Sequence, residues 1–234
     1  MKKSKDIQPA VELGDSVLDS AYSAVINSDD AAKFFRTLYN GLYIRFGQST
    51  LSVVVSSPGD GEGKTMFSMM LAVNSAVTNQ DLPTLLIDCT RDCDSIRALR
   101  MDSTPGGSLV AAGATDSPLK SIRVSGIPSL HVCQVFELRN QHRVLPHAKL
   151  DTLLKSIEGK YASIIVDCES ACDGNDYVAL GRLFQNVLLV TRYRHTRKQQ
   201  LFAQLRALKE ADCSVLGFVI NRRKFAVPKW LYGR

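Results

Sequence analysis

The sequence lacks any apolar run that approaches the roughly 18 residues needed to span a bilayer. Its first residues, 1–16, include basic side chains but lead into no apolar segment, so we expect no secretory signal there. It also lacks internal repeats and low-complexity tracts. These absences favour a globular protein of the cytoplasm.

Metal-binding patterns are missing as well. The six cysteines include two Cys-x3-Cys pairs, but none has the Cys-x2-Cys spacing of common zinc sites. We expect reduced, mostly buried thiols, because the cytosol keeps cysteine reduced. The four histidines show no ligand spacing, and we assign them no function.

Acidic residues are scarce in the C-terminal third of the chain. From Arg192 onward there are eleven Lys or Arg but only Glu210 and Asp212, within a chain whose net charge is +6. Such a region can face anionic lipid, nucleic acid or an acidic partner. It can equally be a solvated helix face followed by a tail, and both interpretations stay open.

The remaining composition is that of a folded domain. A chain of 234 residues that is 45% apolar is long enough for one large, well-buried domain. We divide it into a polar lead-in (1–28), a domain (29–221) and a basic tail (222–234). The domain opens with an amphipathic helix over 29–46, capped by Asp29 or Asp30.

Short apolar runs then alternate with helical patterns. Strands are predicted at 51–56, 84–88, 130–135, 162–167, 186–191 and 214–221, and helices at about 64–79, 92–100, 148–159, 175–183 and 196–212. Several strands are apolar throughout, which is typical of parallel strands covered on both faces. The sequence thus predicts an α/β fold with a mostly parallel sheet and helices on both faces, in which ligands bind beyond the carboxyl ends of the strands.

A glycine-rich loop follows the first of these strands and precedes a helix. Residues 57–65 read Ser-Pro-Gly-Asp-Gly-Glu-Gly-Lys-Thr, which departs from the GxxxxGK[ST] pattern only in having Pro58 at the first glycine. Glycines let backbone N–H groups turn inward around a phosphate, and the helix start adds a positive dipole. We therefore predict a P-loop NTPase whose nucleotide is held by the following residues: Gly59, Asp60, Gly61, Glu62, Gly63, Lys64, Thr65 and Met66.

Two further strands end in aspartate. Asp88 closes "TLLID" and Asp167 closes "SIIVD", so both carboxylates are expected at the edge of the sheet where the loop lies. Together with the Thr65 hydroxyl they are suited to Mg²⁺. We expect Lys64, Asp88 and Asp167 to be the catalytic residues and Thr65, Asp88 and Asp167 the metal site; either aspartate could instead cap a turn.

In these features the chain resembles the bacterial tyrosine kinases of capsule and exopolysaccharide synthesis, within the wider ParA/MinD-like P-loop ATPases. "SSPGDGEGKT" resembles the family's "TSPGPGEGKT", "TLLIDCTRD" its "VLLIDADLR", and "YASIIVDCES" its "YDYVIIDTPP". "KFFRTLYNGL" and "GFVINR" match its "EAFRTLRTNL" and "GVVLNR". The similarity spans residues 29 to 223 in order, and it implies ATP and Mg²⁺ as ligands, with Asn221 and Arg222 holding the adenine.

The sequence also departs from the family. Thr90 replaces the second aspartate of the family's Asp-x-Asp, and Glu169 and Ser170 replace its prolines. The ExxRxxR of the early helix, which helps the family's subunits pack into rings, reads Lys33-x-x-Arg36-x-x-Tyr39, and the tail offers Tyr232 alone as a phosphoacceptor. We expect ATP binding with weak or lost tyrosine autokinase activity.

The resemblance implies a regulator of exopolysaccharide or capsule assembly. Its expected partner is the cytosolic end of a membrane polysaccharide co-polymerase or export protein, which would bring the protein to the membrane. A homo-oligomer and peripheral membrane contact stay open, and nucleic acid is disfavoured. The alternatives are an active tyrosine kinase of the same family and a ParA/MinD-type positioning ATPase. The latter is disfavoured because Gly59 occupies the place of the signature lysine.

Overall fold

The computed structural model describes residues 28–46, 50–79, 81–92, 95, 121–124, 127–134, 152, 154–157 and 159–223. Most of the lead-in and of the helix expected at 92–100, and the tail from 224 onward with Tyr232, lie outside these described residues.

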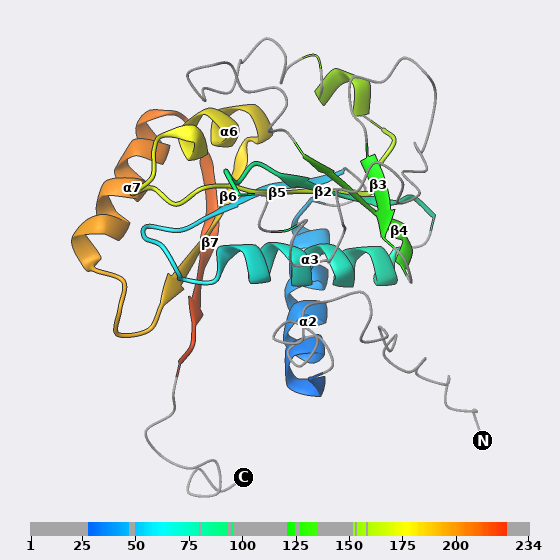
Figure 1. Ribbon diagram of the computed structural model, residues 1–234, viewed down its shortest axis with the longest axis horizontal. Coiled ribbons are helices and arrows are strands. Elements are labelled where there is room, and N and C mark those ends of the chain that lie inside the picture. The colour runs from blue at the N-terminus through cyan, green and yellow to red at the C-terminus, as the bar shows by residue number, and fades with distance from the viewer. Residues whose placement is uncertain are drawn as a thin grey trace, which may run out of the picture.

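A seven-stranded sheet forms the centre of the molecule, in the order β3-β4-β2-β5-β1-β6-β7 (Figure 1). Six neighbouring strands run parallel, and β3 pairs antiparallel with β4 at one edge. Their bounds are β1 (Leu51–Ser56), β2 (Thr84–Asp88), β3 (Ser121–Val124), β4 (Ile127–Gln134), β5 (Ser163–Asp167), β6 (Asn186–Arg192) and β7 (Ser214–Asn221).

Helices cover both faces of this sheet, as the sequence predicts. On one face α3 (Lys64–Thr78) lies along the strands, and α2 (Asp29–Phe46) packs against α3. On the other lie α6 (Asp176–Phe184), which packs on β1 and β6, and α7 (Lys198–Glu210), which packs on β7. None of the described helices is long and apolar enough to cross a bilayer.

The core consists of two apolar clusters, one on each face of the sheet. Alternate residues of each inner strand point to opposite faces, so Val53 joins the cluster under α3 while Val54 joins the one under α6. Every residue of β2 and β5 is therefore buried. This explains why these strands read as continuous apolar runs rather than alternating ones.

The predicted strands 51–56, 84–88 and 214–221 are confirmed residue for residue, and the others differ by a few residues at their ends. The strand β3 escaped prediction because four residues at a sheet edge carry little periodicity. The expected helix 196–212 is shorter, Lys198–Glu210. The Thr196 hydroxyl accepts a hydrogen bond from the Arg192 amide (2.7 Å), and this residue belongs to the preceding turn.

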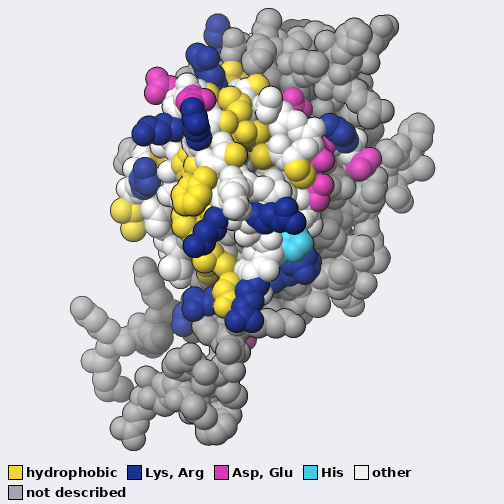
Figure 2. Space-filling model, turned by 90° about the vertical axis from the view of Figure 1, so that its left-hand side faces the viewer, with side chains coloured by type: hydrophobic (Ala, Val, Ile, Leu, Met, Phe, Trp, Pro, Cys, Tyr) yellow, Lys and Arg dark blue, Asp and Glu magenta, His cyan; other side chains and the backbone are white. Residues whose placement is uncertain are grey.

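The edge strand β7 is much less covered than its neighbour β6. Whereas β6 is mostly buried, no residue of β7 is buried, although six of its eight residues are apolar or glycine. The side of the molecule that carries β7 and α7 is the one that faces the viewer in Figure 2.

We expect Phe67→Ala to lower the free energy of unfolding by about 3–5 kcal/mol. The Phe67 ring is buried between α3 and α2, with its centroid 5.1 Å from that of Phe35. Ile44→Ala is the control on α2, because Ile44 is 81% exposed and should change stability by only about 0.5 kcal/mol. Urea denaturation of the three proteins measures both values, and equal losses would contradict this packing.

Candidate functional site

The order of the strands brings three separate sequence motifs together. Because β5 lies between β1 and β2, Asp167 is in register with Val55 on one side and with Asp88 on the other. Backbone hydrogen bonds continue past the strand ends: the Cys89 amide donates to the carbonyl of Asp167 (2.9 Å). Cys168 donates in the same way to Val55 (3.0 Å). The glycine-rich loop after β1 and both aspartates thus share one edge of the sheet.

The glycine-rich loop turns sharply into α3. Gly61 and Gly63 have φ angles of 65° and 96°, in the left-handed region that suits glycine. Lys64 is the first residue of α3, and no described side chain caps the helix start at Gly63. The first N–H groups of the helix therefore point into the loop, which is the arrangement that attracts anions.

Asn221, at the end of β7, fixes the backbone of this loop. Its side-chain amide donates to the Glu62 carbonyl (2.8 Å), and its Oδ1 accepts from the Arg222 amide (2.8 Å). A Cβ atom at Gly63 would lie 2.2 Å from the Asn221 Nδ2, so the Asn221 side chain would have to move and give up its bond to Glu62. Asn221, at the end of the edge strand β7, therefore touches the loop, and its close approach and the positive φ both favour glycine at 63.

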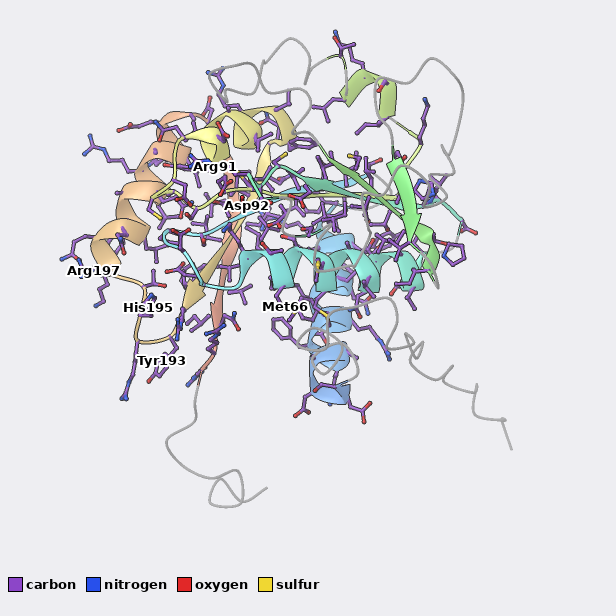
Figure 3. All side chains as sticks on the ribbon, in the orientation of Figure 1. Met66, Arg91, Asp92, Tyr193, His195 and Arg197 are labelled. Atoms are coloured by element: carbon purple, nitrogen blue, oxygen red, sulfur yellow. The ribbon has the colours of Figure 1, made fainter. Side chains whose placement is uncertain are left out.

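The Glu62 side chain links the loop to the segment between β6 and α7. Its Oε1 accepts a hydrogen bond from Thr196 Oγ1 (2.5 Å), while Oε2 is buried without a hydrogen-bond partner among the described residues. Burial raises the pKa of this carboxyl, and the Thr196 hydroxyl and nearby His195 partly offset the rise. Figure 3 shows His195 on the same β6–α7 segment as Tyr193 and Arg197.

Asp167 is fully buried and is bonded to two serine hydroxyl groups. Its Oδ1 accepts from Ser68 Oγ (3.2 Å) and its Oδ2 from Ser95 Oγ (2.8 Å). Burial raises the pKa of Asp167 to about 7, and the Asp88 carboxylate adds to the rise. Ser95, the Lys64 ammonium and the Thr65 hydroxyl act in the opposite direction. The carboxyl therefore exchanges its proton near neutral pH.

Asp88 is held by residues that follow it in the chain. Its Oδ1 accepts from both the amide (2.9 Å) and the hydroxyl (2.6 Å) of Thr90. Its Oδ2 accepts from the Ser95 amide (2.9 Å). Thr90 thus supplies two hydrogen-bond donors to Asp88.

Further acidic side chains, those of Asp60, Asp173 and Glu169, lie on the outer side of the loop. Ser170 donates to Asp60 (2.6 Å) and is also bonded to Asp173. The Ser170 hydrogen bond is the main cause of a lowered pKa at Asp60. Cys172 donates to the same carboxylate (3.5 Å) and is exposed, whereas Cys89, Cys133 and Cys168 are buried, in line with the expectation of mostly buried thiols. Nearby, Glu169 accepts from the Arg91 amide (2.5 Å).

The Lys64 ammonium group acts to lower the pKa of most of these carboxyl groups. Lys64 lies close enough to favour the ionised forms of Asp60, Glu62, Asp167 and Glu169. Two buried carboxyl groups in register, with a threonine hydroxyl bonded to one of them, form an all-oxygen donor set of the kind that Mg²⁺ binds. Burial is the main cause of the raised pKa of Asp167 and the Asp88 carboxylate adds to it, and a cation bound between the two groups would offset both effects. The residues present therefore fit this metal.

Most of the residues singled out in the sequence meet at this edge of the sheet. The loop 59–65, Asp88, Asp167 and Asn221 lie together, whereas Arg222 is exposed beyond β7. The half-buried Met66 side chain packs against the apolar cluster of α2 and α3.

Four contributors escaped the sequence analysis: Ser68, Ser95, Ser170 and Thr196. Ser68 could have been found, because it lies one helical turn after Lys64 and bonds to its carbonyl (2.9 Å). The others are distant in sequence from the residues that they contact.

With this geometry established, the chain can be compared with known proteins. No known family profile and no curated protein sequence matches it. Among solved structures it is similar to the kinase domain of the Escherichia coli tyrosine kinase ETK, with 20% identity over 88% of this chain and 83% of that one, and a TM-score of 0.65. It is also similar to the chimerical protein CapA2B2, with 20% identity over 89% of this chain and 93% of that one, and a TM-score of 0.62.

The septum site-determining protein MinD from Pyrococcus horikoshii, complexed with Mg-ADP, is similar too. It has 18% identity over 78% of this chain and 75% of that one, and a TM-score of 0.52. At these identities the comparisons establish the fold. The chain has the α/β fold of the P-loop NTPases, as bacterial tyrosine kinase domains and MinD do.

We expect Gly63→Ala to disrupt the loop far more than Gly61→Ala. Both positions carry positive φ, which costs an L-residue about 1–2 kcal/mol. Only at position 63 would the new methyl group also collide with Asn221, whereas no atom lies within 4 Å of a Cβ at 61. The collision should add about 1–3 kcal/mol of destabilisation. Urea denaturation of the two variants measures the difference, and equal losses would contradict the contact between Asn221 and the loop.

The raised pKa of Asp167 predicts a pH-dependent stability. Between the unfolded pKa of 3.8 and the folded pKa of about 7, the native state holds a proton that the unfolded state has lost. The free energy of unfolding should therefore fall by a few kcal/mol as pH rises from 4 to 7, and then level off. Asp167→Asn removes this ionisation, so the variant should be more stable than the wild type at pH 8. Unfolding midpoints at pH 5 and pH 8, without Mg²⁺, measure the effect. A wild type with no such fall would contradict the burial of an ionisable group here.

Proposed function

We propose that the protein binds ATP together with Mg²⁺ in the loop 57–66. The observation that carries this proposal is the meeting of an anion-attracting helix start, Lys64, and two carboxyl groups in register at one edge of the sheet. The MinD and cobyrinic acid a,c-diamide synthase structures that share this fold were solved with ADP and magnesium. Asn221, already in contact with the loop, is the residue best placed to sense the base.

The metal would be held by the Thr65 hydroxyl and the Asp167 carboxylate, with Asp88 beside them. When bound, Mg²⁺ neutralises phosphate charge and fixes the phosphate oxygens. Binding of a polyphosphate to this chain would depend strongly on that neutralisation. Asp60, Glu62, Asp167 and Glu169 already surround Lys64, so a polyphosphate without a divalent cation would meet repulsion.

We further propose that tyrosine autokinase activity is weak or lost. Thr90 stands where the similar kinases have a second aspartate, and it donates two hydrogen bonds to Asp88 instead of adding a carboxylate. A carboxylate that moves a proton contributes roughly 10²–10⁴-fold to a rate, so its loss matters. Tyr39, in place of the last arginine of ExxRxxR, is 2% exposed in the α2 core and is not available to a neighbouring subunit through this helix face.

The biological role that follows is regulation of exopolysaccharide or capsule biosynthesis and export. This step rests on the resemblance to the kinases of that system. We propose a protein of the cytoplasm that binds the cytosolic end of a membrane polysaccharide co-polymerase or export protein. Binding of nucleotide would change how the protein binds this membrane partner. It would also control whether the protein assembles with further copies of the chain.

An active tyrosine kinase is the second candidate, and one observation favours it. A carboxylate at a strand end beside Lys64 and Thr65 is suited to accept a proton from a hydroxyl, and Asp167 occupies this place. The two candidates share the nucleotide site and differ in whether phosphate reaches a tyrosine.

Nucleotide binding is tested with Lys64→Ala. We expect its affinity for ATP in the presence of Mg²⁺ to fall at least about 100-fold, because a charge pair at 4 Å contributes on the order of 4 kcal/mol. Lys160 is exposed in the turn before β5, at the opposite end of that strand from Asp167, so Lys160→Ala is the matched control and should bind as the wild type does. Isothermal titration calorimetry measures both, and EDTA should abolish wild-type binding. Equal affinities of the two variants would refute the proposed site.

Kinase activity is tested by incubation with labelled ATP. We expect no labelled protein, or label at a small fraction of one phosphate per chain. If the second candidate is right, the wild type becomes labelled, Tyr232→Phe loses the label, and Asp167→Asn loses it as well. Label that persists in both variants would contradict the roles assigned to these two residues.

A further inference from the structure

The strand β7 forms one edge of the sheet and pairs with β6 alone among the described strands. A register shift opposite Val187 and Leu188 interrupts its first half, but from Gly217 to Asn221 the pairing is continuous. The sequence Ser-Val-Leu-Gly-Phe-Val-Ile-Asn contains neither a charged residue nor a proline. Those are the devices by which edge strands usually avoid pairing with another chain.

The regular half of β7 also presents apolar side chains to solvent. Phe218 is 56% exposed and Ile220 is 49% exposed, and side chains two residues apart share a face of a strand. Phe218 is in register with Leu189, which belongs to the cluster under α6 and α7, so this is the face that α7 covers incompletely. On α7 itself Phe202 is 64% exposed. Figure 2 shows a broken line of hydrophobic side chains down this side of the molecule.

Positive charge flanks the apolar line. Between residues 192 and 223 there are eight Lys or Arg and two acidic residues, and one of these acids, Glu210, is already paired with Arg206 (2.8 Å). Arg192 ends β6 in register with Asn221, and Arg194 and Arg197 are exposed on the segment that follows. In Figure 2 the Lys and Arg side chains lie on both sides of the hydrophobic ones. The surface formed by β7, α7 and the segment 192–197 is called the basic edge below.

Three kinds of partner could cover the basic edge: a bilayer, a second copy of the chain or an extended peptide. The backbone groups and charges of the edge favour the peptide. A bilayer offers no partner for the outer N–H and C=O groups of a strand, and open sheet edges do not enter hydrocarbon. A second copy of the chain, paired edge to edge, would bring two strongly positive surfaces together. An extended peptide satisfies the backbone groups by adding a strand, and alternate apolar residues in it would cover Phe218 and Ile220. Acidic residues at the remaining positions would meet the arginines.

We propose that the basic edge binds an acidic, extended segment of a partner protein by addition of a strand to β7. The segment alternates apolar residues with Asp or Glu over about five residues or more, the length of the regular half of β7. This surface adjoins the nucleotide loop through Asn221 and Thr196, but Phe218 and Ile220 belong to its outer part, and the proposal does not require that ATP binds.

The test uses the full chain and a fluorescein-labelled peptide of about ten residues that alternates Val with Glu. We expect saturable binding by fluorescence polarisation, weakened by added salt because charges are screened. A peptide with Lys in place of Glu, and one with Ser in place of Val, should each bind at least about tenfold more weakly. Amide hydrogen exchange should show new protection at 214–221.

Two variants and one control locate the interaction. Phe218→Thr combined with Ile220→Thr keeps β-forming residues but removes the apolar cover, and should weaken peptide binding about tenfold or more while ATP affinity is unchanged. Arg194→Gln combined with Arg197→Gln, both exposed and thus without effect on folding, should weaken it to a similar degree and reduce its salt dependence. Phe34→Thr combined with Ile44→Thr removes exposed apolar residues on α2 and should change nothing.

Absence of saturable binding, equal binding of the Lys peptide, or protection confined to residues outside 214–221 would each overturn the proposal. Vesicles of phosphatidylcholine with about one third phosphatidylserine provide the remaining arm. If these vesicles bind the wild type, if the Phe218 and Ile220 variant loses that binding, and if the acidic peptide does not compete, the basic edge is a membrane surface and the proposal is wrong.

Discussion

Asp88 and Asp167 lie side by side at the ends of two neighbouring parallel strands, in a place from which water is excluded. Two like charges cannot both be kept there without compensation, and the molecule is arranged around this constraint. Ser68, Ser95 and Thr90 direct hydroxyl or amide donors at the pair. Lys64 adds a positive charge. The same constraint gives the site its preference for a cation.

The glycine-rich loop is held from three directions by residues remote in sequence. Ser170 holds Asp60 from the β5 side, Thr196 holds Glu62 from the β6–α7 segment, and Asn221 binds the loop carbonyl from β7. Residues that follow β5 and β6 and a residue that ends β7 thus hold the loop in its shape. Asn221 and Thr196 lie in the basic edge and also contact the loop. A ligand in the loop and a partner at the basic edge would therefore each affect the other's site.

These contacts show what the residues that depart from the kinase pattern do in the site. Thr90 and Ser170 stand at positions where the similar kinases have an aspartate and a proline, and each forms a hydrogen bond inside the site. Thr90 thereby lowers the negative charge of the site relative to an aspartate, and Ser170 leaves the charge unchanged while it adds a hydrogen-bond donor.

Much of the fold could be read from local pattern. Continuous apolar runs identify buried parallel strands because both faces of such strands are covered, and β1 and β2 were therefore located to the residue. The helix over Asp29–Phe46 was located equally well, since its apolar spacing and acidic start are strong signals. The strand β3 was missed because its existence depends on pairing with β4 rather than on its own four residues.

The sequence by itself determined the parallel sheet, the glycine-rich loop at a helix start, and the two aspartates at strand ends, because each is a property of neighbouring residues. The tertiary structure alone decided that β5 lies between β1 and β2, and hence that Asp88 and Asp167 are in register and share their donors. It also decided that β7 is left with exposed apolar side chains at the sheet edge. Strand order and edge exposure depend on contacts between residues far apart in the chain, and no local pattern encodes them.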